Sequence, residues 1–283
     1  MIGITGATGQ LGQLTIKNLR EKVPADTIVS LVRSPEKAKQ QNPEIEAREF
    51  NYDDPATLEH GLKGITTLFL ISSSEVGKRL PQHTNVINAA KKVGVSHIVY
   101  TSILRADVAQ LQLAEEHKAT EQLIKESGIP YVILRNGWYS ENYVQGVQAV
   151  IDSGVVAGAA GYGRIDTATR NDYAEAAAVV LNHASQHLGK VYELAGDASF
   201  TLQGYADAIS AVTGKEIAYK PMTPDEYKAF LTDVAGIPEG FAAVLANSEQ
   251  YAKEGELSGP SSTLHELIGR ATPSITDLIK QAI

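Results

Sequence analysis

The sequence predicts an α/β fold, with a doubly wound parallel sheet and a smaller, mostly helical C-terminal lobe. Three observations support this prediction. Short apolar runs alternate with amphipathic stretches from the first residues, helix-cap signals stand between them, and mostly helical stretches follow Arg135. Alternating strands and helices imply parallel strands joined by crossover helices.

Five continuous apolar runs predict buried strands, because parallel strands covered on both faces lack the polar alternation of half-exposed ones. A sixth run, over residues 45–50, is a weaker strand candidate. The five runs span residues 2–5, 28–32, 67–71, 97–101 and 131–134.

Helix signals occupy the intervals between these runs. Ser34-Pro35 and Asp54-Pro55 each predict an N-cap followed by proline at the first helical position. Glycines that follow a helical stretch and precede a strand predict left-handed C-terminal caps. These glycines are Gly64, Gly94 and Gly128.

The second half of the chain differs in pattern. Its strands are short (191–194 and 217–220), a glycine-rich stretch covers 154–163, and helices are predicted over 172–181, 202–212 and 272–282. We therefore expect a first domain over 1–137, to which parts of 160–195 return. Residues 138–159 and 196–283 are expected to form the smaller lobe.

Composition excludes several classes of protein. The chain has 283 residues, a formal net charge of −8 and no cysteine, which argues against a basic nucleic-acid surface, thiolate catalysis and cysteine-bound metals. The N-terminal apolar run is too short for a signal peptide and no run is long enough to span a membrane. A cytoplasmic protein is expected, and homo-oligomer formation is left open.

Two histidines, His183 and His187, stand four residues apart on an expected helix. This is a metal-ligand spacing, but no third ligand accompanies it, and histidines near a helix C-terminus also interact favourably with the helix dipole. No metal site is predicted.

A glycine motif follows the first predicted strand and opens a helix. Gly6 permits the tight turn, Gly9 lets a pyrophosphate approach the backbone, and Gly12 lets the helix pack on the strand. The alternative is a glycine-rich structural turn. The whole motif predicts cofactor binding by Gly6, Ala7, Thr8, Gly9, Gln10, Leu11 and Gly12.

The residue at the end of the second strand indicates which dinucleotide binds. Residues 28–34 contain no Asp or Glu for a ribose 2′-hydroxyl, and they include Arg33, 21 residues after Gly12 (33 − 12). A guanidinium there can pair with a 2′-phosphate, so the sequence favours NADPH over NADH. The alternative is an arginine that simply faces solvent at a strand end.

Three segments resemble a known family: ITGATGQLG at 4–12, LISSSEVG at 70–77 and LRNGWYSENY at 134–143. They are similar to the NmrA-like, atypical short-chain dehydrogenases, in particular bacterial NAD(P)H:quinone oxidoreductases and triphenylmethane reductases. The resemblance covers essentially the whole chain and implies a Rossmann domain that binds NADPH.

The resemblance also implies where the cofactor and the acceptor bind. It adds Ser72, Ser73 and Ser74 to the cofactor site. It places a further set around the cleft, which we expect to bind the acceptor: Asn136, Gly137, Trp138, Tyr139 and Asn142. From the residues alone, Tyr139 is expected in the pocket and Trp138 in packing, though each aromatic side chain suits either role.

The position of the catalytic pair departs from ordinary short-chain dehydrogenases. Those enzymes use a Tyr and a Lys four residues apart, whereas this chain has Leu113 and His117. His117 is the catalytic candidate, as a proton donor or as a group that holds the ribose, and the alternative is a histidine on the helix surface.

The leading hypothesis is therefore a reductase that transfers hydride from NADPH directly to quinones. A quinone is already electrophilic and needs less acid catalysis than a ketone, so positioning can supply much of the rate. The alternatives are an NADP(H)-sensing regulatory protein without turnover and a reductase of triphenylmethane-type dyes.

Overall fold

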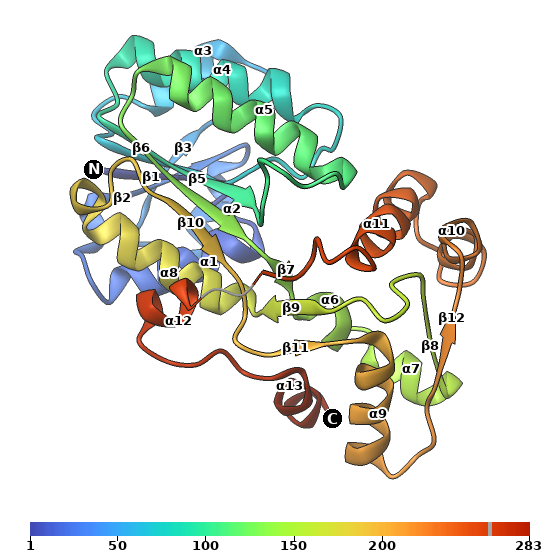
Figure 1. Cartoon of the computed structure of the whole chain (residues 1–283). Helices are drawn as coiled ribbons and strands as arrows, with labels where there is room; N and C mark the ends of the chain where they lie inside the picture. The colour runs from blue at the N-terminus through green and yellow to red at the C-terminus, as the bar shows by residue number, and fades with distance from the viewer. Residues whose placement is uncertain (260–261) are drawn as a thin grey trace. The chain divides into compact units, whose positions relative to one another are not determined.

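The computed structural model describes residues 1–259 and 262–283. Over these residues the chain forms two compact units (Figure 1). Unit 1 comprises Met1–Ala106, Glu116–Asn136 and Arg170–Tyr192. Unit 2 comprises Asp107–Glu115, Gly137–Thr169 and Glu193–Ile283.

Unit 1 is built on a seven-stranded sheet with the order β10-β6-β5-β4-β1-β2-β3. Strands β1 to β6 pair in parallel, which confirms the doubly wound fold. The strands are β1 (Ile2–Thr5), β2 (Ile28–Val32), β3 (Glu46–Glu49), β4 (Thr67–Leu70), β5 (His97–Ile103), β6 (Tyr131–Asn136) and β10 (Val191–Leu194).

All predicted strands of this sheet form, but two run further than their apolar cores. In β5 and β6, Ser102 pairs with Arg135 and Ile103 pairs with Asn136. The hydrophobic pattern stops at polar side chains, whereas backbone pairing continues through them. The sheet therefore carries polar side chains at its carboxyl edge, where ligands bind in open α/β sheets.

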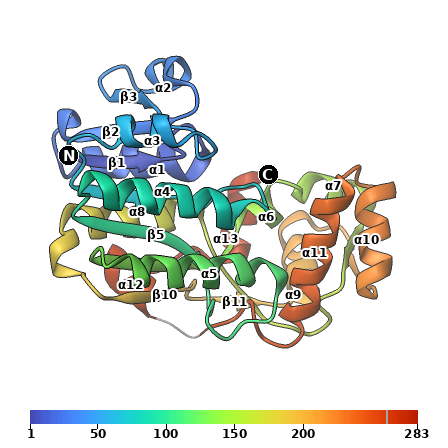
Figure 2. The ribbon, with the colours of Figure 1, turned by 90° about the horizontal axis from the view of Figure 1, so that it is seen from above.

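Helices cover both faces of the sheet. α3, α4 and α5 lie on one face and α1 and α8 on the other (Figure 1), and Figure 2 shows α4 and α5 side by side. The helices of unit 1 are α1 (Gln10–Arg20), η1 (Ala25–Thr27), α2 (Pro35–Gln41), α3 (Pro55–Gly61), α4 (Arg79–Val93), most of α5 (Gln112–Ser127), α8 (Arg170–Asn182) and η2 (Ala184–Gln186).

The expected cap signals have different outcomes. Asp54 caps α3 by accepting a bond from the Ala56 N–H, whereas Ser34 precedes α2 without a side-chain cap bond. Gly64, Gly94 and Gly128 all have positive φ, as predicted. A large apolar cluster beneath α3, α4 and α5 includes buried residues of β2, β4, β5 and β6 and anchors these helices on the sheet.

Unit 2 combines short strands with several helices. β7 (Trp138–Tyr139), β9 (Ile165–Ala168) and β11 (Ser199–Phe200) form one sheet, and β8 (Val155–Gly158) pairs with β12 (Ala218–Pro221). Its helices are α6 (Glu141–Val144), α7 (Val147–Ser153), α9 (Leu202–Thr213), α10 (Pro224–Asp233), α11 (Glu239–Ala252), α12 (Thr263–Ile268) and α13 (Ile275–Ala282).

Three predictions for the second half need correction. The helix expected over 272–282 begins at Ile275, because Ser274 accepts the Asp277 N–H as its N-cap. The strand expected over 217–220 is shifted by one residue. His183 and His187 do not share a helix, because α8 ends at Asn182 and both residues flank the short η2 turn.

Across 1–259 and 262–283, no group of three or more His, Asp or Glu side chains is arranged to hold a metal ion. Within the same residues, every helix is too short or too polar to cross a bilayer.

Candidate cofactor site

The glycine motif forms a tight loop between β1 and α1. Gly6 has a φ of +57°, and the Gly9 N–H donates to the Gly6 carbonyl at 2.9 Å. A Cβ on Gly12 would overlap the Gly6 carbonyl and lie 2.8 Å from the Ala7 Cα, whereas a Cβ on Gly9 would meet only the Gly6 carbonyl, at 3.2 Å. Gly6 and Gly12 are therefore required by the fold, and Gly9 is the most tolerant of the three.

The loop presents an uncapped helix N-terminus. Gly9 is the N-cap of α1, it supplies no side-chain cap bond, and the first turn of α1 has no acidic residue. Backbone N–H groups and the positive end of the helix dipole at such a terminus suit a pyrophosphate. Ala7, Leu11 and Gly12 are buried, while Gly6, Gly9 and Gln10 are exposed and Thr8 is half-buried.

Strand order brings the other predicted cofactor residues to this loop. β1 lies between β4 and β2, so Ser72 follows the strand on one side and Arg33 follows the strand on the other. The Arg33 side chain is 77% exposed, and its Nη1 lies 3.7 Å from the Oε1 of Glu75. Exposure of this kind is compatible with phosphate binding as well as with the solvent-facing alternative.

Side chains from neighbouring strands hold the start of the loop at 72–74. The Ile71 N–H donates to Thr5 Oγ1 and the Ser72 N–H donates to Thr101 Oγ1, both at 2.9 Å. The Tyr52 hydroxyl donates to the Ile71 carbonyl at 3.0 Å. The main chain therefore leaves β4 along a fixed path.

Helix α4 holds the centre of the same loop through the main-chain N–H and the main-chain carbonyl of Ser73. The Ser73 N–H donates to His83 Nε2 at 3.0 Å, and Arg79 Nε donates to the Ser73 carbonyl at 2.6 Å. Because Nε2 accepts, the proton of His83 resides on Nδ1, which donates to Thr120 Oγ1 at 2.9 Å. Burial, followed by the charge of Arg79, lowers the pKa of His83 to about 3, so the ring stays neutral.

His117 belongs to this buried network and not to the helix surface, which corrects the surface alternative. Its side chain is almost fully enclosed, its Nε2 lies 3.3 Å from Arg79 Nη1, and its Nδ1 lies 2.8 Å from the Tyr100 hydroxyl. An arginine can only donate, so Nε2 accepts and Nδ1 carries the proton. Burial, followed by the charge of Arg79, holds the pKa of His117 well below its usual value.

Glu116 fixes the N-terminal end of α4 beside these histidines. Its carboxylate accepts the Gly77 N–H and the Arg79 N–H, both at 3.0 Å. Consequently α5 positions α4 through Glu116, His117 and Thr120, and α4 in turn positions the Ser73 peptide.

The residues predicted to bind the electron acceptor belong partly to unit 1 and partly to unit 2. Asn136 ends β6 in unit 1, and its buried Oδ1 has no hydrogen-bond partner among the described residues, which leaves an acceptor for a ligand at the carboxyl edge. Gly137 follows it in unit 2, where Trp138 and Tyr139 form β7 against Thr167 and Ala168. Both aromatic residues are half-buried, and Asn142 on α6 is exposed.

The fold and the loop geometry together define a dinucleotide-binding α/β protein of the Rossmann type. A family model described as NAD(P)H-binding matches residues 6–184, which is more than half of the chain. The chain belongs to this NAD(P)H-binding family, and the resemblance to NmrA-like short-chain dehydrogenases is confirmed.

Individual relatives match over nearly the full length. Quinone oxidoreductase 2 of Escherichia coli strain K12 is 49% identical over 99% of this chain and 97% of its own. The crystal structure of the NADPH-dependent quinone oxidoreductase of E. coli, complexed with NADPH, has a TM-score of 0.96, 48% identity and 99% coverage of each chain. Triphenylmethane reductase of Citrobacter sp., complexed with NADP(H), has a TM-score of 0.95, 38% identity and complete coverage of both chains.

Several residues of this site were missed by sequence reasoning. Arg79, Gln82 and His83 lie at i, i+3 and i+4 on α4 and continue the buried stripe of Val86 and Ile87. Polar side chains on the buried face of a helix were the available signal, because they must find partners in the interior.

Proposed function

We propose that this protein is an NADPH-dependent reductase that transfers hydride directly to quinones or similar conjugated acceptors. The observation that carries the proposal is the 49% identity to quinone oxidoreductase 2 over 99% of the chain. The glycine loop, the uncapped α1 and the exposed Arg33 support it independently. NADPH, when bound, supplies the hydride.

We assign the pyrophosphate to the segment from Gly6 to Gly12, the 2′-phosphate to Arg33, and the neighbouring part of the cofactor to Ser72, Ser73 and Ser74. The N–H groups of α1 would bind the phosphates, and the rigid Ser73 peptide would orient the dinucleotide. Preorganised donors of this kind lose little freedom on binding.

For His117 we propose a positioning role. Its neutral ring and its engaged nitrogens do not favour proton donation to an acceptor, but they do favour holding Arg79 against the Ser73 carbonyl. Asn136, Gly137, Trp138, Tyr139 and Asn142 are proposed to bind the acceptor, with the aromatic faces suited to a planar ring. No side chain is assigned as proton donor, which suits acceptors that are already electrophilic.

Dye reduction is a second candidate, because triphenylmethane reductase is 38% identical over the whole chain. Regulatory sensing of NADP(H) without turnover is the alternative outside catalysis. The acidic net charge of −8 supports a protein that does not bind nucleic acid directly, and we place it in the cytoplasm as part of the same proposal.

The test is steady-state kinetics with NADPH and matched acceptors: a quinone panel, simple ketones and a triphenylmethane dye. We expect good turnover with quinones and little with ketones. Efficient ketone reduction would refute the mechanism, and tight NADPH binding without any turnover would favour the sensor.

Cofactor choice is tested by calorimetric titration. Arg33→Ala should weaken NADPH binding by about tenfold to a hundredfold, the effect of one charge-assisted phosphate contact. Lys92→Ala, which also removes an exposed cation of unit 1, is the matched control and should bind NADPH normally. Equal affinities of the parent protein for NADPH and NADH would contradict the assignment of Arg33.

A further inference from the structure

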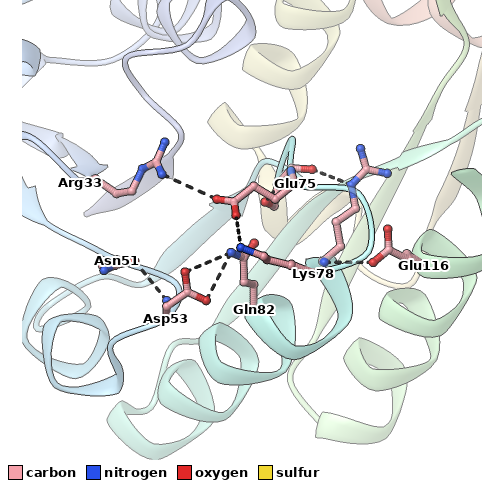
Figure 3. Close-up of polar contacts among 9 residues, drawn as sticks. Arg33, Asn51, Asp53, Glu75, Lys78, Gln82 and Glu116 are labelled. Carbon is pink, nitrogen blue, oxygen red and sulfur yellow. Dashed lines mark hydrogen bonds and ion pairs between the residues drawn. The ribbon is translucent and has the colours of Figure 1, made fainter. Parts of the chain in front are cut away.

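The sequence contains no acidic residue at the end of β2, yet the structure places a carboxylate beside Arg33. Glu75 belongs to the connection between β4 and α4, and its Oε1 lies 3.7 Å from Arg33 Nη1. Figure 3 shows the two side chains pointing toward one another. The acid is 42 residues away in sequence (75 − 33), so a search limited to the β2 end does not find it.

Glu75 is held in this place by further contacts. Its Oε2 accepts from Lys78 Nζ at 3.3 Å, and its main-chain N–H donates to Ser73 Oγ at 3.2 Å (Figure 3 shows Lys78 beside it). The carboxylate therefore lies between two cations, Arg33 and Lys78.

The ion pair crosses the cofactor loop. Glu75 comes from the β4 end and Arg33 from the β2 end, and β1 lies between these strands. The two residues therefore follow the strands on either side of β1, after which the glycine loop begins. A nucleotide bound on this loop would meet the pair at its adenosine end, because the residue after the second strand reads the adenosine ribose.

We propose that Glu75 is a specificity-determining residue, which competes with the cofactor's 2′-phosphate for Arg33 and so limits the preference for NADPH over NADH. The carboxylate occupies the guanidinium when no phosphate is present, and it is a like charge beside the phosphate when NADPH binds. NADH lacks that phosphate and is not opposed. This inference rests on the proposed function, specifically on Arg33 as the 2′-phosphate ligand.

The test is calorimetric titration of the full-length protein with NADPH and NADH. Glu75→Gln preserves the shape of the side chain and removes its charge. We expect NADPH to bind about three- to tenfold more tightly and NADH to change by less than about twofold, the range for a charge at a partly exposed site. In an Arg33→Gln background the gain from Glu75→Gln should shrink, because the two residues would act as a coupled pair.

Glu59→Gln is the matched control, since Glu59 is a similarly exposed acid of unit 1 that pairs with Lys92. It removes the same charge away from the loop and should leave both affinities unchanged. An equal gain from Glu59→Gln, an unchanged or weaker NADPH affinity in Glu75→Gln, or an equal gain without Arg33 would each overturn the inference. If Arg33→Gln weakens NADPH while Glu75→Gln is silent, only this inference fails. A parent protein that binds no NADPH would overturn the proposed function as well.

Discussion

Two glycine-rich segments, one in each unit, look alike in sequence and differ in what their backbone binds. In unit 2, side chains accept from the backbone of residues 154–163: the buried Glu249 accepts the Ala159 N–H through Oε2 at 2.5 Å, and the Tyr219 hydroxyl accepts the Gly161 N–H at 3.1 Å. In unit 1, residues 6–12 lead into α1, which has no side-chain cap.

The comparison shows that glycine content alone does not identify a ligand site. In the unit 2 segment the chain supplies its own hydrogen-bond acceptor, Glu249, and a Cβ on Gly158 would overlap Leu202 and meet Glu249, so this glycine serves internal packing. In the unit 1 segment the helix dipole and the first-turn N–H groups remain available to an external anion.

The largest effect is expected within the unit 1 loop itself. Gly12→Ala should destabilise the protein by about 3 kcal/mol or more, because the new Cβ would overlap backbone atoms that cannot move aside. Gly9→Val should leave the fold intact and weaken NADPH binding by more than about a hundredfold, about 2.7 kcal/mol, since its side chain would occupy the space of the pyrophosphate.

Thermal unfolding and calorimetric NADPH titration of both variants measure the two effects. If Gly9→Val folds and binds NADPH with unchanged affinity, the loop is structural, like its counterpart in unit 2.

The second effect concerns the buried carboxyl group of Glu249 in unit 2. Burial raises the pKa of Glu249 from an ordinary value near 4.5 to about 7. The folded state then binds more protons than the unfolded state, so this residue's contribution to stability is full below about pH 4.5 and is lost as pH rises through about 7. The loss should reach about 3 kcal/mol, from roughly 1.36 kcal/mol for each pKa unit.

Urea unfolding of the parent and Glu249→Gln between pH 4 and pH 8 tests this expectation, with pH values chosen to span the window. The variant should lack the parent's loss and should become the more stable protein at the upper end. Glu239→Gln removes an exposed acid paired with Lys228 and should behave as the parent does. A parallel pH profile for parent and Glu249→Gln would show that the carboxylate is ionised without penalty.

Sequence reasoning was most successful where local pattern determines structure. The runs at 2–5 and 28–32 have the same bounds as β1 and β2, and Gly94 has the left-handed conformation expected of a helix cap. Hydrophobic period and φ preference act over a few residues, so they can be read without knowing the partners.

The missed features depend on residues that are distant in sequence. Glu75 and Arg33 meet only because their strands, β4 and β2, lie on either side of β1 in the folded sheet. His83 accepts the Ser73 N–H only when α4 packs beside α5. The polar ends of β5 and β6 were missed for a related reason, since pairing of Ser102 with Arg135 is a property of two strands. Residue type alone contains no information about such partners.

His117→Ala is expected to lower kcat/KM for NADPH by about a hundredfold at most, the lower end of the span for a lost acid–base group. A positioning role predicts that most of the change appears in the KM for NADPH, because Arg79 would lose the acceptor that orients it toward Ser73. His117→Gln, which retains a side-chain acceptor, should recover much of the loss. By contrast, Tyr139→Ala and Asn142→Ala should raise the KM for the quinone. A lost limb in the kcat pH profile with unchanged KM values would instead identify His117 as a proton donor.

The smallest effect tests how the protein itself holds a backbone group beside the cofactor loop. His83→Phe keeps a ring of similar size but removes the acceptor of the Ser73 N–H, leaving a buried donor without its partner. The expected cost is about 2 kcal/mol of unfolding free energy at neutral pH, typical of one unsatisfied buried group. NADPH affinity should fall with it, because the Ser73 N–H would no longer be held from α4. The sign of the pH dependence is opposite to that of Glu249: the depressed pKa of His83, about 3, means that its contribution to stability is full above about pH 6.5 and is lost as pH falls toward 3.

Tyr52→Phe is the control, since it removes a donor to the neighbouring Ile71 carbonyl and leaves Ser73 held. Chemical unfolding at pH 7 and pH 5, together with NADPH titration, measures both readouts. Equal NADPH affinity in His83→Phe and the parent would show that cofactor binding does not require the Ser73 peptide to be held from α4.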